Sequence, residues 1–167
     1  GIQISDFQSL KRALRLRMDR FAECGCRAGD HGLDHAFYSP FTEEAVSAIL
    51  KKGKIGVALS DEEIAQYKTA LLSFCAEEYR KRGWVMQIHY NCLRNPNRKM
   101  FRALGPDTGF DCIGPNNDSL ALAKLLDVLY AENKLPKTIL YSLDASDNAF
   151  LDTLIGSFQG TEVAGKL

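Results

Sequence analysis

Apolar side chains recur every three or four positions through residues 6 to 23, and this spacing predicts an amphipathic helix. Ser5 or Asp6 can cap the start of this helix, because a short polar side chain accepts a hydrogen bond from a backbone N–H group of the first turn. Gly25 ends it. This stretch gives the clearest helical pattern near the start of the sequence.

A long helix is predicted between Ser60 and about Arg82. Ser60 and Glu63 have the spacing of a capping box, in which each side chain binds a backbone N–H group that the first turn leaves unpaired. The other predicted helical segments are residues 42 to about 50 or 52, before a surface turn over residues 51–56; residues 99–104; residues 119–132, capped by Asp118; and a last helix that Asp144 and Ser146 introduce and that ends near Phe158.

The stretch Trp84–Arg94 is predicted to form one buried strand between two helical regions. Ile88 is among its apolar residues, Gly83 ends the helix before it, and Pro96 prevents a regular strand beyond it. His89 then lies at or near the carboxyl end of the strand, where α/β folds place ligand-binding groups. His89 is therefore the first candidate for a functional residue.

Two further strands are predicted, over residues 26–30 and 138–143, and residues 31–35 are expected to form a loop. Helices between the strands favour right-handed crossovers and a parallel sheet. A closed eight-stranded barrel typically needs about 250 residues, so 167 residues with three or four strands predict an α/β segment with an open sheet. We expect its exposed edges to favour self-association and the tail, residues 160–167, to lack a partner.

Composition and charge exclude several functional classes. The chain is 46% hydrophobic and has a formal net charge of zero, so a single α/β segment with a sizeable core is expected. The basic cluster between Lys11 and Arg20 fits a solvated helix face better than a nucleic-acid surface, because acidic residues balance the basic ones. The sequence has neither an apolar run of membrane-spanning length nor a signal-peptide pattern, and a cytoplasmic protein is expected.

Histidine and cysteine spacing gives little support for a metal site built by this chain alone. His31 and His35 are four residues apart, but Gly32 weakens a helix between them. The five cysteines are odd in number, and Cys24-Gly-Cys26 lacks the two-residue gap of zinc and redox motifs, so free thiols are expected. Asp30 beside His31 is a stronger candidate, because a carboxylate can fix the tautomer of an imidazole or complement it in proton transfer.

The other candidates each have a structural alternative. His89 can be a functional residue or a core histidine bonded to a backbone carbonyl. Arg94 lies just past the predicted strand and offers a planar fork to the carboxylate of an anionic substrate, but it can also form an ion pair with Asp107 or Asp111. Both aspartates lie in a turn-rich loop and can cap its turns.

Several long stretches of the sequence resemble the uronate isomerase (glucuronate isomerase) family, and they come in that family's order over nearly all 167 residues. So many long stretches are more specific than any single motif. The stretches are Cys26-Arg-Ala-Gly-Asp-His-Gly-Leu-Asp34, Arg82-Gly-Trp-Val-Met-Gln-Ile-His89, Leu93-Arg-Asn95, Leu104-Gly-Pro-Asp-Thr-Gly-Phe-Asp111, Leu135-Pro-Lys-Thr-Ile-Leu-Tyr141 and Asp147-Asn148. Tyr90-Asn-Cys92 departs from the family's usual residues, which are smaller.

The resemblance implies an interior segment of a (β/α)8 barrel of the amidohydrolase superfamily. It also implies an isomerase that converts D-glucuronate to D-fructuronate, and D-galacturonate to D-tagaturonate, by moving a proton between C2 and C1. By resemblance, Asp30 and His31 face the sugar, His89 neighbours the metal or contacts the substrate, Arg94 lies near the substrate carboxylate, and Asp107 is a weaker substrate contact. The family's divalent metal, zinc in many accounts, is held by a His-x-His pair and a late aspartate that this chain lacks.

The sequence therefore favours a part of a uronate isomerase that is catalytically incomplete alone and that binds no metal by itself. Two alternatives remain open. The chain can be a noncatalytic module in which His89 and Arg94 bind a sugar acid, which requires both residues to meet on one open face. It can also be a folding unit without a site, which requires neither.

Overall fold

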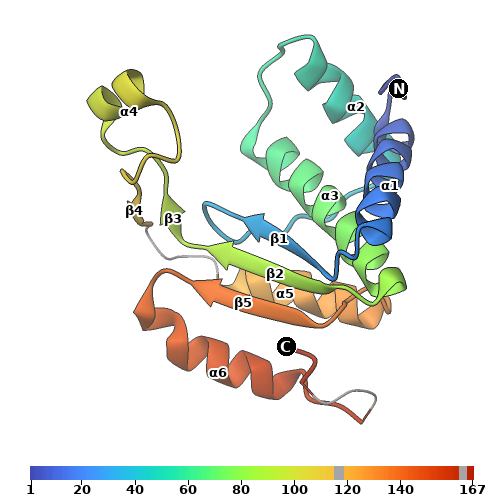
Figure 1. The fold of residues 1–167 in the computed structure, drawn as a ribbon, viewed down its shortest axis with the longest axis vertical. Coiled ribbons are helices and arrows are strands. Elements are labelled where there is room, and N and C mark those ends of the chain that lie inside the picture. Colours follow the sequence, from blue (N-terminus) through green and yellow to red (C-terminus); the bar gives the residue numbers. More distant parts are fainter. Residues whose placement is uncertain (115–118, 162–164) are drawn as a thin grey trace.

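Helices alternate with parallel strands along this chain, of which a computed structural model describes residues 1–114, 119–161 and 165–167. The strands are β1 (Ala28–Gly32), β2 (Val85–Tyr90), β3 (Cys92–Leu93), β4 (Cys112–Ile113) and β5 (Thr138–Ser142). The helices are α1 (Phe7–Glu23), α2 (Glu43–Lys54), α3 (Asp61–Arg82), α4 (Arg98–Leu104), α5 (Ser119–Ala131) and α6 (Asn148–Ser157), with a 3₁₀ turn over Ala145–Asp147. The main sheet is parallel with β2 at its centre, in the order β1-β2-β5, and β3 and β4 form a small antiparallel pair (Figure 1).

The longest helix, α3, carries start and stop signals at both ends. The Ser60 side chain accepts from the Glu63 backbone N–H group, and the Glu63 carboxylate accepts from that of Ser60, which completes the capping box. Acidic residues fill the first turn and basic residues the last, and both complement the helix dipole. Gly83 adopts the left-handed conformation (φ 66°) that ends the helix, so β2 begins only two residues later.

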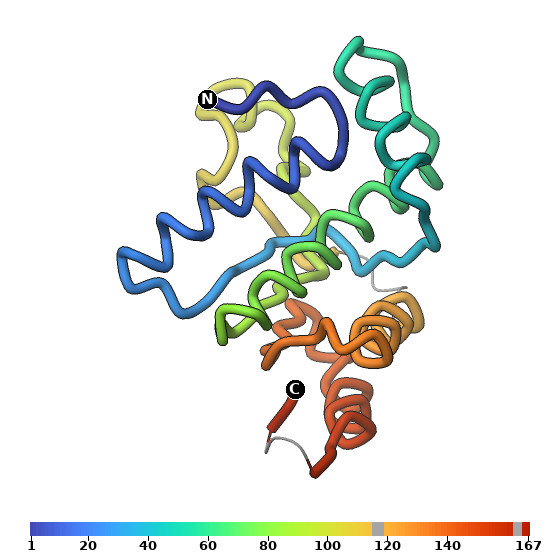
Figure 2. Tube along the Cα trace, turned by 90° about the vertical axis from the view of Figure 1, so that its right-hand side faces the viewer, coloured from blue at the N-terminus to red at the C-terminus, as the bar shows by residue number. Residues whose placement is uncertain are grey.

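The alternation of side chains along β2 determines what the sheet buries. Met86, Ile88 and Tyr90 are at most 2% exposed and belong to one core cluster with side chains of α1, α3, α5 and α6. The alternate residues, Gln87 and His89, are only partly buried. Figure 2 shows α1 and α3 running side by side. α3 contacts both α1 and α5, so these three helices form a continuous packed group.

The predicted α/β architecture with parallel strands and flanking helices is confirmed. The helices predicted at residues 6–23 and 60–82 match α1 and α3, and the strand predicted at residues 138–143 matches β5. All five cysteines are free thiols, as expected. The predicted cap Asp118 lies outside the described residues. Within the described ranges, no helix is long and apolar enough to cross a membrane.

Three predicted boundaries are wrong. The single strand over 84–94 breaks at Asn91, where φ is 66° and the extended ladder cannot continue. The predicted turn over 51–56 is helical as far as Lys54, since lysines favour a helix and its carboxyl end. β1 extends to Gly32, into the predicted loop. The predicted start of the last helix is confirmed, because the Asp144 side chain accepts from the Ser146 backbone N–H group at the 3₁₀ turn that leads into α6.

The prediction that the tail lacks a partner is also wrong. The Thr138 backbone N–H group donates to the Lys166 carbonyl oxygen over 3.0 Å, so the last described residues pair with the start of β5. Leu167 packs against the main core cluster. A free strand edge favours such a contact because it offers unpaired backbone groups.

A buried carboxylate connects the two longest helices. The Glu78 side chain on α3 is 4% exposed and receives hydrogen bonds from Arg15 Nε of α1 (3.1 Å), Arg82 Nη1 (2.7 Å) and Lys81 Nζ (3.1 Å). Burial raises the pKa of Glu78, but the hydrogen bonds from Arg82, Arg15 and Lys81 outweigh it and lower the pKa to about 2. Glu78 is therefore ionised in the folded protein down to strongly acidic pH.

Replacing Glu78 by Gln should lower the free energy of unfolding by about 2 to 3 kcal/mol at pH 7, because Arg15, Lys81 and Arg82 lose a buried counter-charge. Since the folded pKa of Glu78 lies below its unfolded value, this contribution is complete above about pH 5 and is lost as the pH falls toward 2. Urea unfolding at pH 7 and pH 3 measures the difference.

Glu77→Gln is the matched control, because Glu77 is the preceding residue and, within the described part of the chain, pairs only with Lys81, at the surface. We expect its cost to stay below about 0.5 kcal/mol. Equal losses in the two variants would show that Glu78 does not connect α1 to α3.

Candidate active site at the carboxyl edge of the sheet

Side chains from all three parallel strands meet at the carboxyl edge of the sheet. His89 on β2 is the register partner of Gly32 on β1 and of Tyr141 on β5. The imidazole of His89 stacks on the Tyr141 ring, with centroids 4.2 Å apart and an interplanar angle of 3°. Asp30 reaches His89 diagonally from β1, and its Oδ1 lies 2.8 Å from Nδ1 of His89.

The pair of His89 and Asp30 fixes one imidazole nitrogen and leaves the other available. A carboxylate bound at Nδ1 places the proton there, so Nε2 keeps its lone pair for a proton or a metal ion. The His89 side chain is 42% exposed and that of Asp30 60% exposed. The structure therefore excludes a histidine satisfied only by a buried backbone carbonyl.

Arg94 lies at the same edge, beyond the break at Asn91. A side chain at Gly32 would lie 3.1 Å from Arg94 Nη2, so the guanidinium stands over the end of β1. Arg94 Nη1 donates to Asp111 Oδ2 over 2.8 Å, while Asp34 and Asp107 lie 3.9 Å from the guanidinium. Hydrogen bonds from the Asn95 backbone and from Arg94 lower the pKa of Asp111.

The predicted alternative of an ion pair between Arg94 and Asp111 is thus confirmed. His89 and Arg94 nevertheless meet near Gly32, as the sugar-acid site requires. Three carboxylates thus face this guanidinium, and only Asp111 lies within hydrogen-bond distance of it among the described residues. The Asp107 carboxylate accepts hydrogen bonds, so it suits a sugar hydroxyl group rather than a substrate carboxylate.

His31 lies on the opposite side of β1 from Asp30. Its ring centroid is 5.7 Å from that of Tyr79 on α3, and its Nε2 is buried without a hydrogen-bond partner among the described residues. Alternation along a strand separates neighbouring side chains, so Asp30 and His31 do not form the predicted pair. His31 is in a strand and the exposed His35 in the following loop, which also rules out two ligands one helical turn apart.

A buried polar cluster fastens the ends of β2 and β5. Asn91 Nδ2 donates to Ser142 Oγ (3.0 Å) and to Asp147 Oδ2 (2.7 Å), and Ser142 Oγ donates to the same carboxylate oxygen (2.8 Å). Burial and then Asp147 raise the pKa of Tyr90. The sequence reasoning missed Asn91; the signal was an asparagine between two apolar stretches, since asparagine tolerates positive φ.

The departure at Tyr90-Asn-Cys92 affects the core more than the open face. Tyr90 and Cys92 are buried, and Asn91 belongs to the polar cluster. These side chains therefore lie beneath the edge of the sheet and leave His89 exposed.

The candidate residues do not amount to a metal site. Among residues 1–114, 119–161 and 165–167, no group of three or more His, Cys, Asp or Glu side chains could hold an ion. His89 offers one nitrogen, and Asp30 is engaged in orienting that ring. A divalent ion needs additional ligands from other residues.

The glucuronate isomerase family model matches residues 1–167. Curated uronate isomerases of Salmonella paratyphi B and Salmonella newport are each 52% identical over 167 residues, which is 99% of this chain and 36% of those proteins. The chain thus spans about a third of the length of the curated relatives it matches.

Two solved structures are similar to this fold. The uronate isomerase of Thermotoga maritima matches with a TM-score of 0.87 and 28% identity, over 95% of this chain and 35% of that protein. The glucuronate isomerase of Caulobacter crescentus matches with a TM-score of 0.78 and 27% identity, over 88% and 30%. The three parallel strands therefore correspond to part of a uronate isomerase fold.

Asn91 generates a prediction about the edge of the sheet. Asn91→Gly keeps the backbone conformation but loses the bonds to Ser142 and Asp147, which should cost about 1 to 3 kcal/mol of unfolding free energy. Asn91→Ala should cost about 1 kcal/mol more, because alanine is strained at a φ of 66°. Chemical denaturation ranks the variants.

Asn133→Gly is the matched control, since Asn133 also has positive φ (55°) but is exposed. Its stability should change by no more than about 0.5 kcal/mol. If Asn91→Ala were as stable as Asn91→Gly, backbone strain would not contribute at this position.

Proposed function

Because this chain belongs to the glucuronate isomerase family, we propose that it supplies one side of the active site of an enzyme that interconverts an aldose uronate and its ketose isomer. The substrates would be D-glucuronate or D-galacturonate, in the cytoplasm. The single observation that carries this proposal is the Asp30–His89 pair at the carboxyl edge of a parallel sheet. We further propose that residues 1–167 act as a single α/β segment.

The isomerisation removes a proton from C2 of the open-chain sugar and returns a proton to C1 through an enediolate. His89, oriented by Asp30, would present the Nε2 lone pair to the reaction centre, and Tyr141 would hold the imidazole plane in place. Arg94 would approach the substrate carboxylate, and Asp107 would accept a sugar hydroxyl. His31, predicted as a catalytic residue, lies on the other face of β1, against Tyr79.

For the metal, we propose only which residue of this chain would contribute a ligand. In the whole enzyme, His89 would be one ligand of a divalent ion, with zinc the first candidate, and other segments would provide the remaining ligands. The described residues of this chain do not complete such a site. We therefore propose that the isolated chain is inactive.

A chimera tests the functional assignment. The chain should replace the matching 167 residues of the Salmonella paratyphi B relative, with which it is 52% identical. We expect the chimera to isomerise glucuronate, and Asp30→Asn and His89→Asn to lower kcat/KM by about 10- to 100-fold, the range found when a ligand-orienting partner is removed.

Arg102→Ala is the control in the same chimera, because Arg102 on α4 is exposed and outside the candidate site. Arg94→Ala should raise KM more than it lowers kcat, since it removes a contact that substrate and transition state share. A folded chimera that is inactive, or that His89→Asn leaves unchanged, would refute the assignment.

The open sheet also supports a proposal about assembly. The free edge of β1 and most of the free edge of β5 expose backbone groups, and Ile139 (43% exposed) and Tyr141 (39% exposed) leave apolar surface beside them. We propose that isolated chains self-associate through these edges. Light scattering should show a mass that rises with concentration.

Ile139→Lys should shift the chain toward the monomer, because it places a charge beside the open edge of β5. Leu120→Lys is the control, since Leu120 on α5 is more exposed (68%) but is remote from the strand edges in sequence. A wild-type chain that stays monomeric at all concentrations would contradict the proposal.

A further inference from the structure

A loop that contains α4 leaves the carboxyl edge of the sheet and returns to it; we call residues 94–111 the edge loop. Figure 1 shows α4 standing apart from the helices that pack on the main sheet, and no residue of α4 is buried. The antiparallel pair of β3 and β4 closes the base of the loop, with Leu93 opposite Cys112. Arg94 and Asp111 occupy the next position of the same register, so the strand pairing itself sets them face to face.

The Asp111 carboxylate connects two neighbouring groups of the edge loop. Its Oδ2 accepts a hydrogen bond from Arg94 Nη1 over 2.8 Å, and its Oδ1 accepts one from the Asn95 backbone N–H group over 2.8 Å. Asn95 has a φ of 49°, a conformation that costs a residue other than glycine free energy and persists only where the surroundings hold it. Asp111 therefore fixes the backbone just after β3 together with the head group of Arg94.

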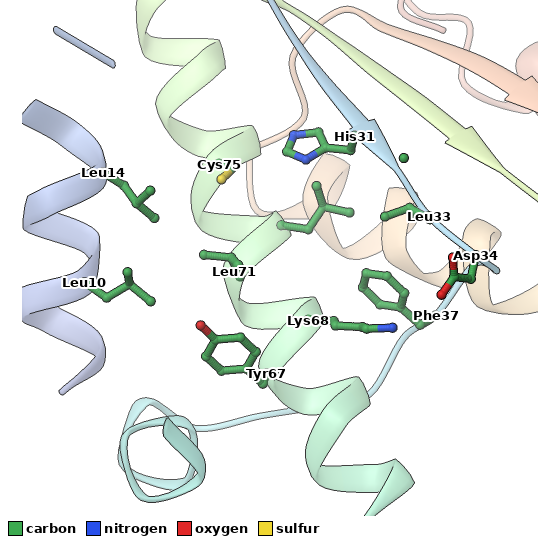
Figure 3. Close-up of a pocket in the computed structure, with 12 residues that line it drawn as sticks. Leu10, Leu14, His31, Leu33, Asp34, Phe37, Tyr67, Lys68, Leu71 and Cys75 are labelled. Atoms are coloured by element: carbon green, nitrogen blue, oxygen red, sulfur yellow. The ribbon is translucent and has the colours of Figure 1, made fainter. Parts of the chain in front are cut away.

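The other two carboxylates near Arg94 are poorly placed to orient it. Asp34 and Asp107 lie 3.9 Å from the guanidinium, and their side chains are 60% and 83% exposed, compared with 25% for Asp111. Figure 3 shows Asp34 on the segment that leaves β1, where it also lines the cavity between α1 and α3. Exposed ion pairs without a hydrogen bond restrict a side chain little. Among the described residues, Asp111 thus has the main influence on how the guanidinium is turned.

This orientation leaves one edge of the guanidinium for a ligand. A Cβ atom at Gly32 would lie 3.1 Å from Arg94 Nη2, and Gly32 is the register partner of His89. Within the described part of the chain, the acidic contacts of Arg94 use Nη1 and Nε. A planar guanidinium has five N–H donors in a rigid fork, so holding Nη1 also fixes the direction of the Nη2 donors.

We propose that Asp111 is a positioning residue that holds Arg94 Nη2 beside His89, ready to bind the carboxylate of the sugar acid. This inference rests on the proposed function. Asp111 would act through Arg94 without touching the sugar, and a guanidinium held in place before binding loses less freedom when the substrate arrives. If Asp111 only closed the edge loop, its effect on the substrate would not depend on Arg94.

A double-mutant cycle in the Salmonella paratyphi B chimera separates these roles. We expect Asp111→Ala to raise KM for glucuronate at least about tenfold while kcat changes less than about threefold, because a contact made in the ground state is misplaced. In the Arg94→Ala background, the same replacement should change KM less than about twofold, since no guanidinium remains to be positioned. Should Asp111→Ala fail to fold, Asp111→Asn replaces it, because the amide is nearly the same size and lacks the charge.

Asn97→Ala is the matched control within the edge loop. The exposed Asn97 side chain caps α4 by accepting from the Met100 backbone N–H group over 3.1 Å, and its replacement loosens the loop without removing a contact of Arg94. We expect KM to stay within about twofold of the unmodified chimera. An equal rise of KM in Asn97→Ala and Asp111→Ala, or an equal effect of Asp111→Ala with and without Arg94, would overturn the proposal while an active chimera upheld the isomerase assignment.

The side-chain ¹⁵N NMR signals of Arg94 in residues 1–167 give a readout that needs no activity. A guanidinium held by a hydrogen bond rotates slowly, so we expect separate Nη1 and Nη2 signals that Asp111→Asn merges and Asp107→Asn leaves separate. Arg94→Lys identifies the signals. Merged signals in the unmodified chain would overturn the positioning role whatever the chimera does. A folded but inactive chimera with separate signals would instead refute the isomerase assignment, and the substrate role of Asp111 would fall with it.

Discussion

The central strand β2 is hydrogen-bonded on both sides, and the rest of the chain depends on the alternation that this pairing enforces. Met86, Ile88 and Tyr90 must point to one face, where the helices bury them almost completely. Gln87 and His89 must then point to the other face. A shift of register by one residue would exchange the two sets, exposing the core and burying an imidazole. The core therefore fixes the position of His89.

The same constraint explains why the site combines residues of β1, which is far from β2 in the sequence, with residues that directly follow β2. Pairing of β1 with β2 sets Gly32 beside His89, and the missing side chain at Gly32 leaves room for the Arg94 guanidinium. The left-handed residue Asn91 ends β2 and turns the chain toward Arg94, while its amide holds the end of β5 through Asp147. Stability and site geometry thus share the same residues at this edge.

The sequence predicted the parts of this arrangement that depend on local patterns. Helix spacing and the capping box defined α1 and α3, and the apolar run placed His89 near a strand end. Local patterns could not predict which residues pair across the sheet. Asp30 was expected to pair with His31, but it bonds His89, which is 59 residues away. The contact of Lys166 with Thr138 was missed for the same reason, since a free strand edge is visible only once the sheet is known. The ion pair of Arg94 with Asp111 was foreseen because both residues lie near one loop.

The adjacent residues Asp30 and His31 show how one strand can serve two different environments. Asp30 stays charged on an open face, beside the imidazole that it orients. His31 is pressed against Tyr79 under α3, where desolvation favours the neutral ring. β1 is short and has a free edge, so its position depends on β2 and on the helices above it. Asp30 and His31 share one backbone segment. A contact that moves β1 relative to α3 must therefore also move Asp30 relative to His89.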